Sequence, residues 1–142
     1  MNKVTANVET SHAILRLSGK YVIQLRDDKP DIACRGQWSL FGGRIDPGET
    51  PLEAIKREVF EELSIKQEDF KFLWHADYYS DFVKCLVRTW FFTAELDNVW
   101  SGHNLKEGRE IGIFSFEELK TLDIPEVIRK SLNRFNKEAG KP

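Results

Sequence analysis

The chain has 142 residues, of which 41% are hydrophobic and 31% charged, and its formal net charge is −2. Such values are typical of one globular domain that buries roughly two-thirds of the surface of its unfolded chain. The near-neutral charge argues against a nucleic-acid footprint, and no apolar run reaches the about 18 residues of a membrane span. We therefore expect one domain over residues 1–142, with neither nucleic acid nor membrane as a partner.

The two cysteines, Cys34 and Cys85, lie 51 positions apart in unrelated sequence contexts. This spacing matches neither a metal-ligand pair nor a disulfide framework. The N-terminal residues also lack the apolar segment of a signal peptide. We therefore expect reduced thiols and a cytoplasmic location.

Residues 12–30 contain two β-like runs, HAILRLSG and KYVIQLRDDKP, which Ser18 and Gly19 join as a hairpin. In the second run, Gln24 and Arg26 fall on the same side of the alternating pattern. One face of the predicted sheet therefore carries polar groups.

The segment WSLFGG, residues 38–43, reads as a short apolar strand that ends in paired glycines. A helix follows, because Thr50 and Glu53 form a capping box around Pro51, which takes the first helical position. At about 100° per residue, four apolar side chains of this helix fall in one stripe that must face the core. They are Leu52, Ile55, Val59 and Leu63.

Residues 69–96 are rich in aromatic and β-branched side chains and predict two or three strands, the clearest being VKCLVRTWFFTAEL at residues 83–96. Ser115 and Glu118 form a second capping box that opens a short helix, and Pro125 opens a last amphipathic helix. The apolar face of that last helix consists of Ile128, Leu132 and Phe135. The predicted order, ββ, α, βββ, α, α, favours a mixed sheet flanked by helices.

Carboxylates are crowded on the helix of GGRIDPGETPLEAIKREVFEELSI, residues 42–65. Glu58, Glu61 and Glu62 share an edge beside the apolar stripe, and like charges one turn apart repel each other. A hard divalent cation removes the conflict, because it binds several oxygen ligands and cancels their charge. Mg²⁺ binds few carboxylates and completes its shell with water and substrate phosphates, and the glycines before the helix let backbone approach a ligand closely.

Each of these glutamates, taken singly, fits a solvated helix surface equally well, but their joint spacing does not. Gly43 is followed after five residues by Glu49, and after seven more by REVFEELSI, which begins at Arg57. This spacing resembles the Nudix box, Gly43–Ile65, at every position but one, where Ser64 replaces a glycine. That glycine would be the left-handed residue that ends the helix. Serine there either costs roughly 1 kcal/mol or lets the helix end in another way, and it leaves the carboxylates untouched.

The resemblance implies an α/β/α sandwich around a mixed β-sheet, formed by a single Nudix hydrolase domain. Members of this family mostly hydrolyse a nucleoside diphosphate linked to another moiety, using Mg²⁺ or sometimes Mn²⁺. By motif position, Glu58 and Glu62 would be the main metal ligands and Glu61 a ligand or general base. The carbonyl near Gly43 would be a further ligand.

The resemblance also implies that Arg57 and Glu49 orient the ligands through salt bridges. The general base varies across the family and often lies outside the box. Glu107 and Glu110, in the loop before the last strand, are the candidates there, although ordinary loop carboxylates would look the same. The predicted catalytic set thus comprises Glu61, Glu62, Arg57, Glu107 and Glu110.

An acidic site needs positive charge to hold an anionic substrate. Arg26, from the polar strand face, and Arg44, from the box loop, are the candidates for contacts with substrate phosphates. Four aromatic side chains could stack on a base, although aromatics in strands more commonly pack in the core. They are Trp38, Phe41, Trp74 and Tyr78.

Three functions fit this resemblance. The first is metal-activated attack of water on phosphorus in the diphosphate linkage of a nucleotide sugar, a nucleotide or a similar small molecule. The second is attack at the glycosyl carbon of a nucleotide sugar, which needs a base such as His75 or His103. The third is a nucleotide-binding module without catalysis, which the intact box disfavours. Many relatives are dimers, so a homodimer is one assembly that the resemblance allows.

Overall fold

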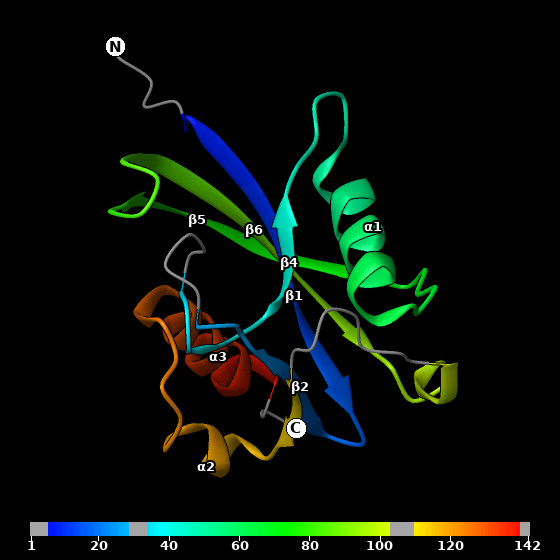
Figure 1. Cartoon of the computed structure of the whole chain (residues 1–142). Helices are drawn as coiled ribbons and strands as arrows, with labels where there is room; N and C mark the ends of the chain where they lie inside the picture. Colours follow the sequence, from blue (N-terminus) through cyan, green and yellow to red (C-terminus); the bar gives the residue numbers. More distant parts are fainter. Residues whose placement is uncertain (1–5, 29–33, 103–109, 140–142) are drawn as a thin grey trace.

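The computed structural model describes residues 6–28, 34–102 and 110–139 (Figure 1). Seven strands form one sheet: β1 (Val8–Leu17), β2 (Lys20–Leu25), β3 (Trp38–Ser39), β4 (Phe41–Arg44), β5 (Lys71–Ser80), β6 (Cys85–Glu95) and β7 (Glu110–Phe114). The helices are α1 (Pro51–Leu63), α2 (Phe116–Leu119) and α3 (Glu126–Ala139), with a 3-10 turn, η1 (Trp100–Gly102). Within these ranges, no helix is long and apolar enough to cross a membrane.

The sheet is mixed, as the sequence predicts. Its main path is β3-β2-β1-β6-β5, with β4 paired to β1 and β7 paired to β2. β1 and β6 run parallel, whereas the other pairs are antiparallel. Ser18 and Gly19 form the predicted hairpin turn, with φ of 50° and 80°, as a tight two-residue connection requires.

The segment 38–43 is not one strand, as the sequence predicted, but two. β3 pairs with β2, and after Leu40 the chain leaves β2 and pairs with β1 as β4. The register of β4 places Gly42 opposite His12 and Gly43 opposite Ser11. This change of partner brings the glycines to the middle of the sheet, beside α1.

Two hydrophobic cores cover the two faces of the sheet, and successive residues of β1 point to opposite faces. Ala13 and Leu15 pack in the core on the α1 side, and Ile14 packs in the core on the α3 side. The helices contribute the predicted residues Ile55, Val59 and Leu63 to one core, and Ile128, Leu132 and Phe135 to the other. Figure 1 shows α1 and α3 on opposite sides of the sheet, which confirms the predicted α/β/α sandwich.

One predicted core residue of α1 is not buried. Leu52 is 38% exposed, whereas Ile55, one turn later, is fully buried. The helical stripe is continuous, but Leu52 belongs to the first turn, and the helix comes over the sheet only from Ala54 onward. The position of Leu52 around the helix axis therefore did not predict its burial, because Leu52 lies at the N-terminal end of the helix.

Ser64 ends α1 in the left-handed conformation, which was one of the two alternatives that the sequence left open, with φ of 59° and ψ of 25°. Its backbone N–H donates a 2.8 Å hydrogen bond to the carbonyl oxygen of Phe60. A serine side chain is strained in this conformation, and a glycine is not.

Replacing Ser64 with glycine should therefore raise the free energy of unfolding by up to about 1 kcal/mol and leave activity unchanged. Denaturant unfolding measures the difference. Lys130→Gly, in the exposed middle of α3, is the matched control and should lose about 1 kcal/mol, because glycine weakens a helix interior. A clear loss of stability in Ser64→Gly would reject this account of the helix end.

Candidate functional site

A cavity of about 450 Å³ lies on the face of the sheet that carries α3 and extends to the carboxylates of α1. Its charged lining consists, among the described residues, of Arg26, Arg44, Glu58, Glu61 and Glu62. The other described lining residues are uncharged and come from β1, β3, β4, β5, β6 and α3, from the segment at Cys34 and from the turn at Phe82 and Val83. The cavity wall thus combines the acidic side chains of α1 with two arginines and with uncharged side chains.

Glu62 is the most firmly positioned of the carboxylates. It is 9% exposed, its Oε1 accepts a 3.0 Å hydrogen bond from the backbone N–H of Gly42, and its Oε2 accepts one of 3.2 Å from Nε2 of Gln24. Gln24 is itself fully buried and also donates to the carbonyl oxygen of Leu40. Two donors, one from β4 and one from β2, therefore fix both oxygens of Glu62.

Gln24 is a site residue that sequence reasoning missed. The alternating pattern of β2 placed Gln24 on the polar sheet face, yet the pattern cannot tell a buried polar residue from an exposed one. A buried amide is expected to be hydrogen-bonded, and here its partner lies 38 positions away on α1.

The paired glycines are required by close packing. A Cβ at Gly42 would collide with the carbonyl oxygen of Ser11 and lie 2.8 Å from Cα of His12. A Cβ at Gly43 would lie 2.7 Å from the carboxylate of Glu58, so this carboxylate sits directly against the Gly43 backbone. The glycine at position 43 therefore allows the carboxylate of Glu58 to pack against the backbone.

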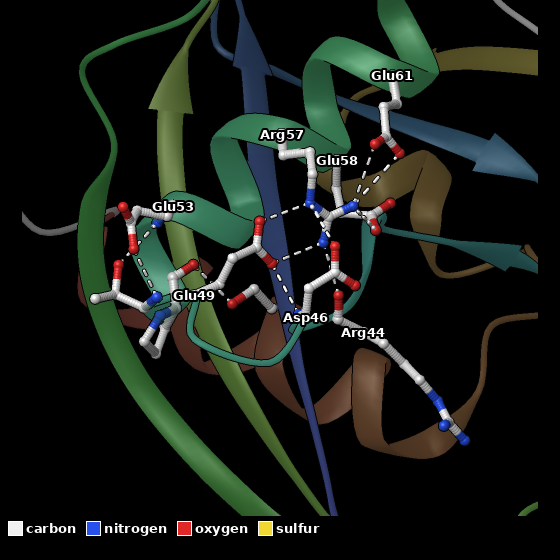
Figure 2. Close-up of polar contacts among 10 residues, drawn as sticks. Arg44, Asp46, Glu49, Glu53, Arg57, Glu58 and Glu61 are labelled. Atoms are coloured by element: carbon white, nitrogen blue, oxygen red, sulfur yellow. Dashed lines mark hydrogen bonds and ion pairs between the residues drawn. The ribbon is translucent and has the colours of Figure 1, made fainter.

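Arg57 links the box loop to the helix (Figure 2). Its Nε and Nη2 donate to the two carboxylate oxygens of Glu49 at 2.6 and 2.9 Å, which lowers the pKa of Glu49. Nη2 also donates to the carbonyl oxygen of Arg44 at 2.9 Å, and Nη1 donates to Oε1 of Glu58 at 2.8 Å. The planar guanidinium thereby fixes the loop, the helix and one carboxylate relative to each other.

Asp46 is a second missed member of this cluster. Its backbone N–H donates to Oε1 of Glu49 at 2.8 Å, and its carboxylate lies 3.4 Å from Nε of Arg57. The turn Asp46–Glu49 that makes this contact is visible in Figure 2. The sequence signal for this contact was the short polar loop DPGE, residues 46–49. In the structure, Gly48 of this loop takes a φ of 84°.

Glu58, Glu61 and Glu62 differ in exposure. Glu58 is half-buried, and burial raises the pKa of its carboxyl while Arg57 opposes the rise. Glu61 is 54% exposed in its side chain and contacts Nη1 of Arg57 at 3.3 Å. Glu61 is therefore the least shielded of the three, because it lies one step further round the helix from the sheet.

Glu58, Glu62 and the Gly43 backbone offer oxygen atoms to a hard divalent cation, and the contact between Glu58 and Gly43 suits such an ion. In the described part of the chain, however, no three His, Cys, Asp or Glu side chains converge as a ready-made metal site. Glu62 is turned toward Gln24 and Gly42, and Arg57 lies between Glu58 and Glu61. The donor set therefore fits a cation that takes the rest of its ligands from water and substrate, as Mg²⁺ does.

The predicted phosphate-binding arginines both line the cavity. Figure 2 shows the side chain of Arg44 extending away from the Arg57 cluster, while its carbonyl oxygen stays within it. Glu110 begins β7 opposite Leu25 and is not among the described residues that line the cavity. Glu107 lies outside the described residues.

Of the two histidines proposed for attack at carbon, the structure describes only His75, and it does not line the cavity. His75, on β5, is 43% exposed, lies 3.8 Å from Asp77 and does not contribute to the described lining. His103 lies outside the described residues. Of the candidate stacking aromatics, Tyr78 lines the cavity, whereas Phe41, Trp38 and Trp74 belong to the hydrophobic cores or their margins.

Comparison with known proteins agrees with this geometry. The family model of the NUDIX domain matches residues 8–135. The crystal structure of a MutT protein from Methanosarcina mazei superposes with a TM-score of 0.80 at 23% identity, covering 94% of this chain and 96% of that one. The NUDIX domain of Shewanella oneidensis NrtR, solved with ADP ribose, gives a TM-score of 0.77 at 15% identity, covering 96% and 90%.

Curated relatives match shorter segments. Human 8-oxo-dGDP phosphatase NUDT18 is 54% identical over 35 residues, covering 25% of this chain and 11% of its own. The CTP pyrophosphohydrolase of Escherichia coli is 36% identical over 59 residues, covering 42% of each chain. Nudix hydrolase 3 of Caenorhabditis elegans is 28% identical over 110 residues, which is 75% of this chain and 43% of that protein.

The chain thus spans less than half of these three curated relatives. The family match, in contrast, covers nearly all of the described structure, from β1 to α3. Together with the sandwich fold and the Arg57-linked carboxylates beside Gly43, it identifies this chain as a member of the Nudix hydrolase family.

Proposed function

We propose that this protein hydrolyses the diphosphate linkage of a nucleoside diphosphate derivative, such as a nucleotide sugar or a nucleotide, with Mg²⁺ or Mn²⁺ as cofactor. The observation that carries the proposal is the array of Glu58, Glu61 and Glu62 on the wall of a 450 Å³ cavity, ordered by Arg57. A cavity of this size accommodates a small molecule. Its carboxylates suit a metal ion, its arginines suit phosphate, and its uncharged lining suits the remainder of the substrate.

Glu58, Glu62 and the Gly43 carbonyl are the groups that would hold the cation. The bound cation would neutralise charge that develops on the phosphoryl oxygens and lower the pKa of a bound water. Gln24 and the Gly42 N–H keep the Glu62 carboxylate in one orientation, and Arg57 keeps Glu58 in place. Arg26 and Arg44 would bind phosphate oxygens of the substrate and balance the acidic wall.

Glu61 is the carboxylate of the box that is best placed to accept a proton. It is the most exposed of the three, and its contact with Arg57 is longer than that of Glu58. A general base must reach the attacking water and must be ionised at the working pH. Glu107 and Glu110 remain the candidates outside the box.

The relatives support the class of substrate without naming it. NUDT18 is an 8-oxo-dGDP phosphatase, the E. coli relative acts on CTP, and the NrtR domain was solved with ADP ribose. A Francisella tularensis enzyme of the same fold, at a TM-score of 0.71, was solved with AMP and a manganese ion. All of these molecules carry a nucleoside joined to phosphate.

The test is a panel of nucleotide sugars, dinucleotides and nucleoside di- and triphosphates, incubated with Mg²⁺ or Mn²⁺ while every phosphate-containing product is quantified. We expect metal-dependent hydrolysis that EDTA abolishes, with ¹⁸O from labelled water found in a phosphate product. Label in a free sugar would instead indicate attack at carbon. Binding of nucleotides without turnover would indicate a binding module and reject the proposed activity.

A further inference from the structure

His12 lines the same cavity but belongs to none of the groups discussed above. It lies on β1, opposite Gly42 of β4 on one side and Phe91 of β6 on the other. Its ring packs so closely on Gly42 that a Cβ there would lie 2.8 Å from Cδ2 of His12. The imidazole is therefore held against the strand that also holds Glu62.

The two ring nitrogens of His12 have different surroundings. Nδ1 is buried and forms no hydrogen bond within the described structure. His12 as a whole is partly exposed and lines the cavity, and Nε2 is not among the buried, unpaired atoms of these residues, which is consistent with the Nε2 edge of the ring facing the cavity. Burial and the nearby Arg26 lower the pKa of His12 to about 4, so the ring is neutral at pH 7.

A neutral imidazole carries its proton on one nitrogen and a lone pair on the other. Buried N–H groups without an acceptor are rarer in proteins than buried acceptors without a full set of donors. The arrangement therefore favours the lone pair on the buried Nδ1 and the proton on Nε2. His12 then presents one N–H donor, in a fixed direction, to the cavity.

Uncharged side chains lie near this donor, together with Arg26. Thr10 lies two residues before His12 on the same face of β1, and its hydroxyl shares a 2.8 Å hydrogen bond with the hydroxyl of Thr89. Tyr78 and the side chains of Val8 and Val87 complete this part of the lining. Flat apolar contacts around a few hydrogen-bonding groups suit a nucleobase, whereas phosphate oxygens are better bound by arginine.

We propose that His12 is a specificity-determining residue, whose Nε2–H donates a hydrogen bond to an acceptor atom on the nucleobase of the substrate. The proposal rests on the proposed function. It adds to that function the position of the nucleobase and the group that distinguishes one base from another. A pocket that hydrogen-bonds its substrate rejects an analogue that offers no acceptor there, because the donor is then left unpaired.

The test measures binding rather than turnover. The probes are the α,β-methylene diphosphates of adenosine, guanosine, cytidine and uridine, with methylenediphosphonate as a probe without a base. Dissociation constants are measured by calorimetry in the presence of Mg²⁺ for the wild type, His12→Phe and His12→Gln. Phenylalanine keeps a ring without nitrogen, and the glutamine amide nitrogen takes a position near that of Nε2. His75→Phe, the same change outside the cavity, is the matched control.

We expect the wild type to prefer one base, and His12→Phe to weaken binding of that nucleotide by about 10-fold while the other bases change less. His12→Gln should recover most of the loss. Binding of methylenediphosphonate should stay within about twofold in both variants, and His75→Phe should match the wild type with every probe. Thermal unfolding of each variant confirms that the fold is retained.

Equal weakening of all probes, including methylenediphosphonate, would show that His12 acts on the diphosphate and would overturn the proposal. An unchanged preference among the bases in His12→Phe, or no preference in the wild type, would overturn it as well. If the wild type binds nucleotides selectively but hydrolyses none of the parent compounds, only the proposed function fails. If it binds none of the nucleotide analogues, both proposals fail.

Discussion

Glu62→Gln is expected to lower kcat/KM with the preferred substrate by more than about 100-fold, since even residues that only support a metal ligand typically contribute 10–100-fold. The substitution removes a ligand charge at nearly constant shape. It also disturbs the hydrogen bonds that hold this side chain, because both carboxylate oxygens of Glu62 accept a hydrogen bond in the wild type. A glutamine amide can accept from Gly42 or from Gln24, but its NH₂ group must then face the other donor.

The free energy of unfolding of Glu62→Gln should therefore fall by up to about 2 kcal/mol, while the protein stays folded. Glu53→Gln is the matched control, because it removes one charge from the same helix. Glu53 is exposed and belongs to the capping box, where glutamine also caps. Its activity should stay within about twofold of the wild type. Full activity in Glu62→Gln would contradict the metal-site assignment.

Arg57→Lys is expected to lower kcat/KM by about 10–100-fold although the charge is kept. One ammonium cannot contact both oxygens of Glu49, the carbonyl oxygen of Arg44 and Glu58 at once, as the guanidinium does. In the variant, Glu58 and the loop 44–49 are then no longer held in fixed positions relative to each other. Steady-state kinetics and Mn²⁺ titration measure the effect. Both kcat/KM and the apparent affinity for Mn²⁺ should fall.

Arg88→Lys offers the same chemical change away from the cavity. Arg88 forms a two-pronged contact with the carboxylate of Asp77, at 2.8 and 2.9 Å, on the β5–β6 pair. We expect this control to keep wild-type kinetics. If Arg57→Lys also keeps them, Arg57 stabilises the loop without positioning the carboxylates, and the proposed role of the cluster is wrong.

Much of the site could be predicted because it depends on local geometry. The capping boxes at Thr50 and Ser115 formed as predicted, since their partners lie three residues apart. Ser64 adopts the left-handed conformation that the missing glycine implied. The pairing of Arg57 with Glu61 follows from their i,i+4 spacing on one helix.

The errors arose where burial depends on what lies next to a helix or strand. Leu52 occupies the apolar stripe but not the part of it that is buried. The strand at 38–43 changes partner after Leu40, a choice made by the neighbouring strands. The periodicity of a sequence predicts the side of a helix or strand on which a side chain lies. It does not predict which other element packs against that side chain.

The sequence by itself placed the carboxylates on one helix and carried the resemblance to the Nudix box, because both depend on residue spacing within a continuous segment. The sandwich fold was what that resemblance implied. Only the tertiary structure decided how the carboxylates are held and what they face. Gln24 meets Glu62 across 38 positions, and His12 packs against Gly42 from another strand. These contacts join strands and a helix that are distant in sequence, so their geometry is fixed by packing and sheet register rather than by any local pattern.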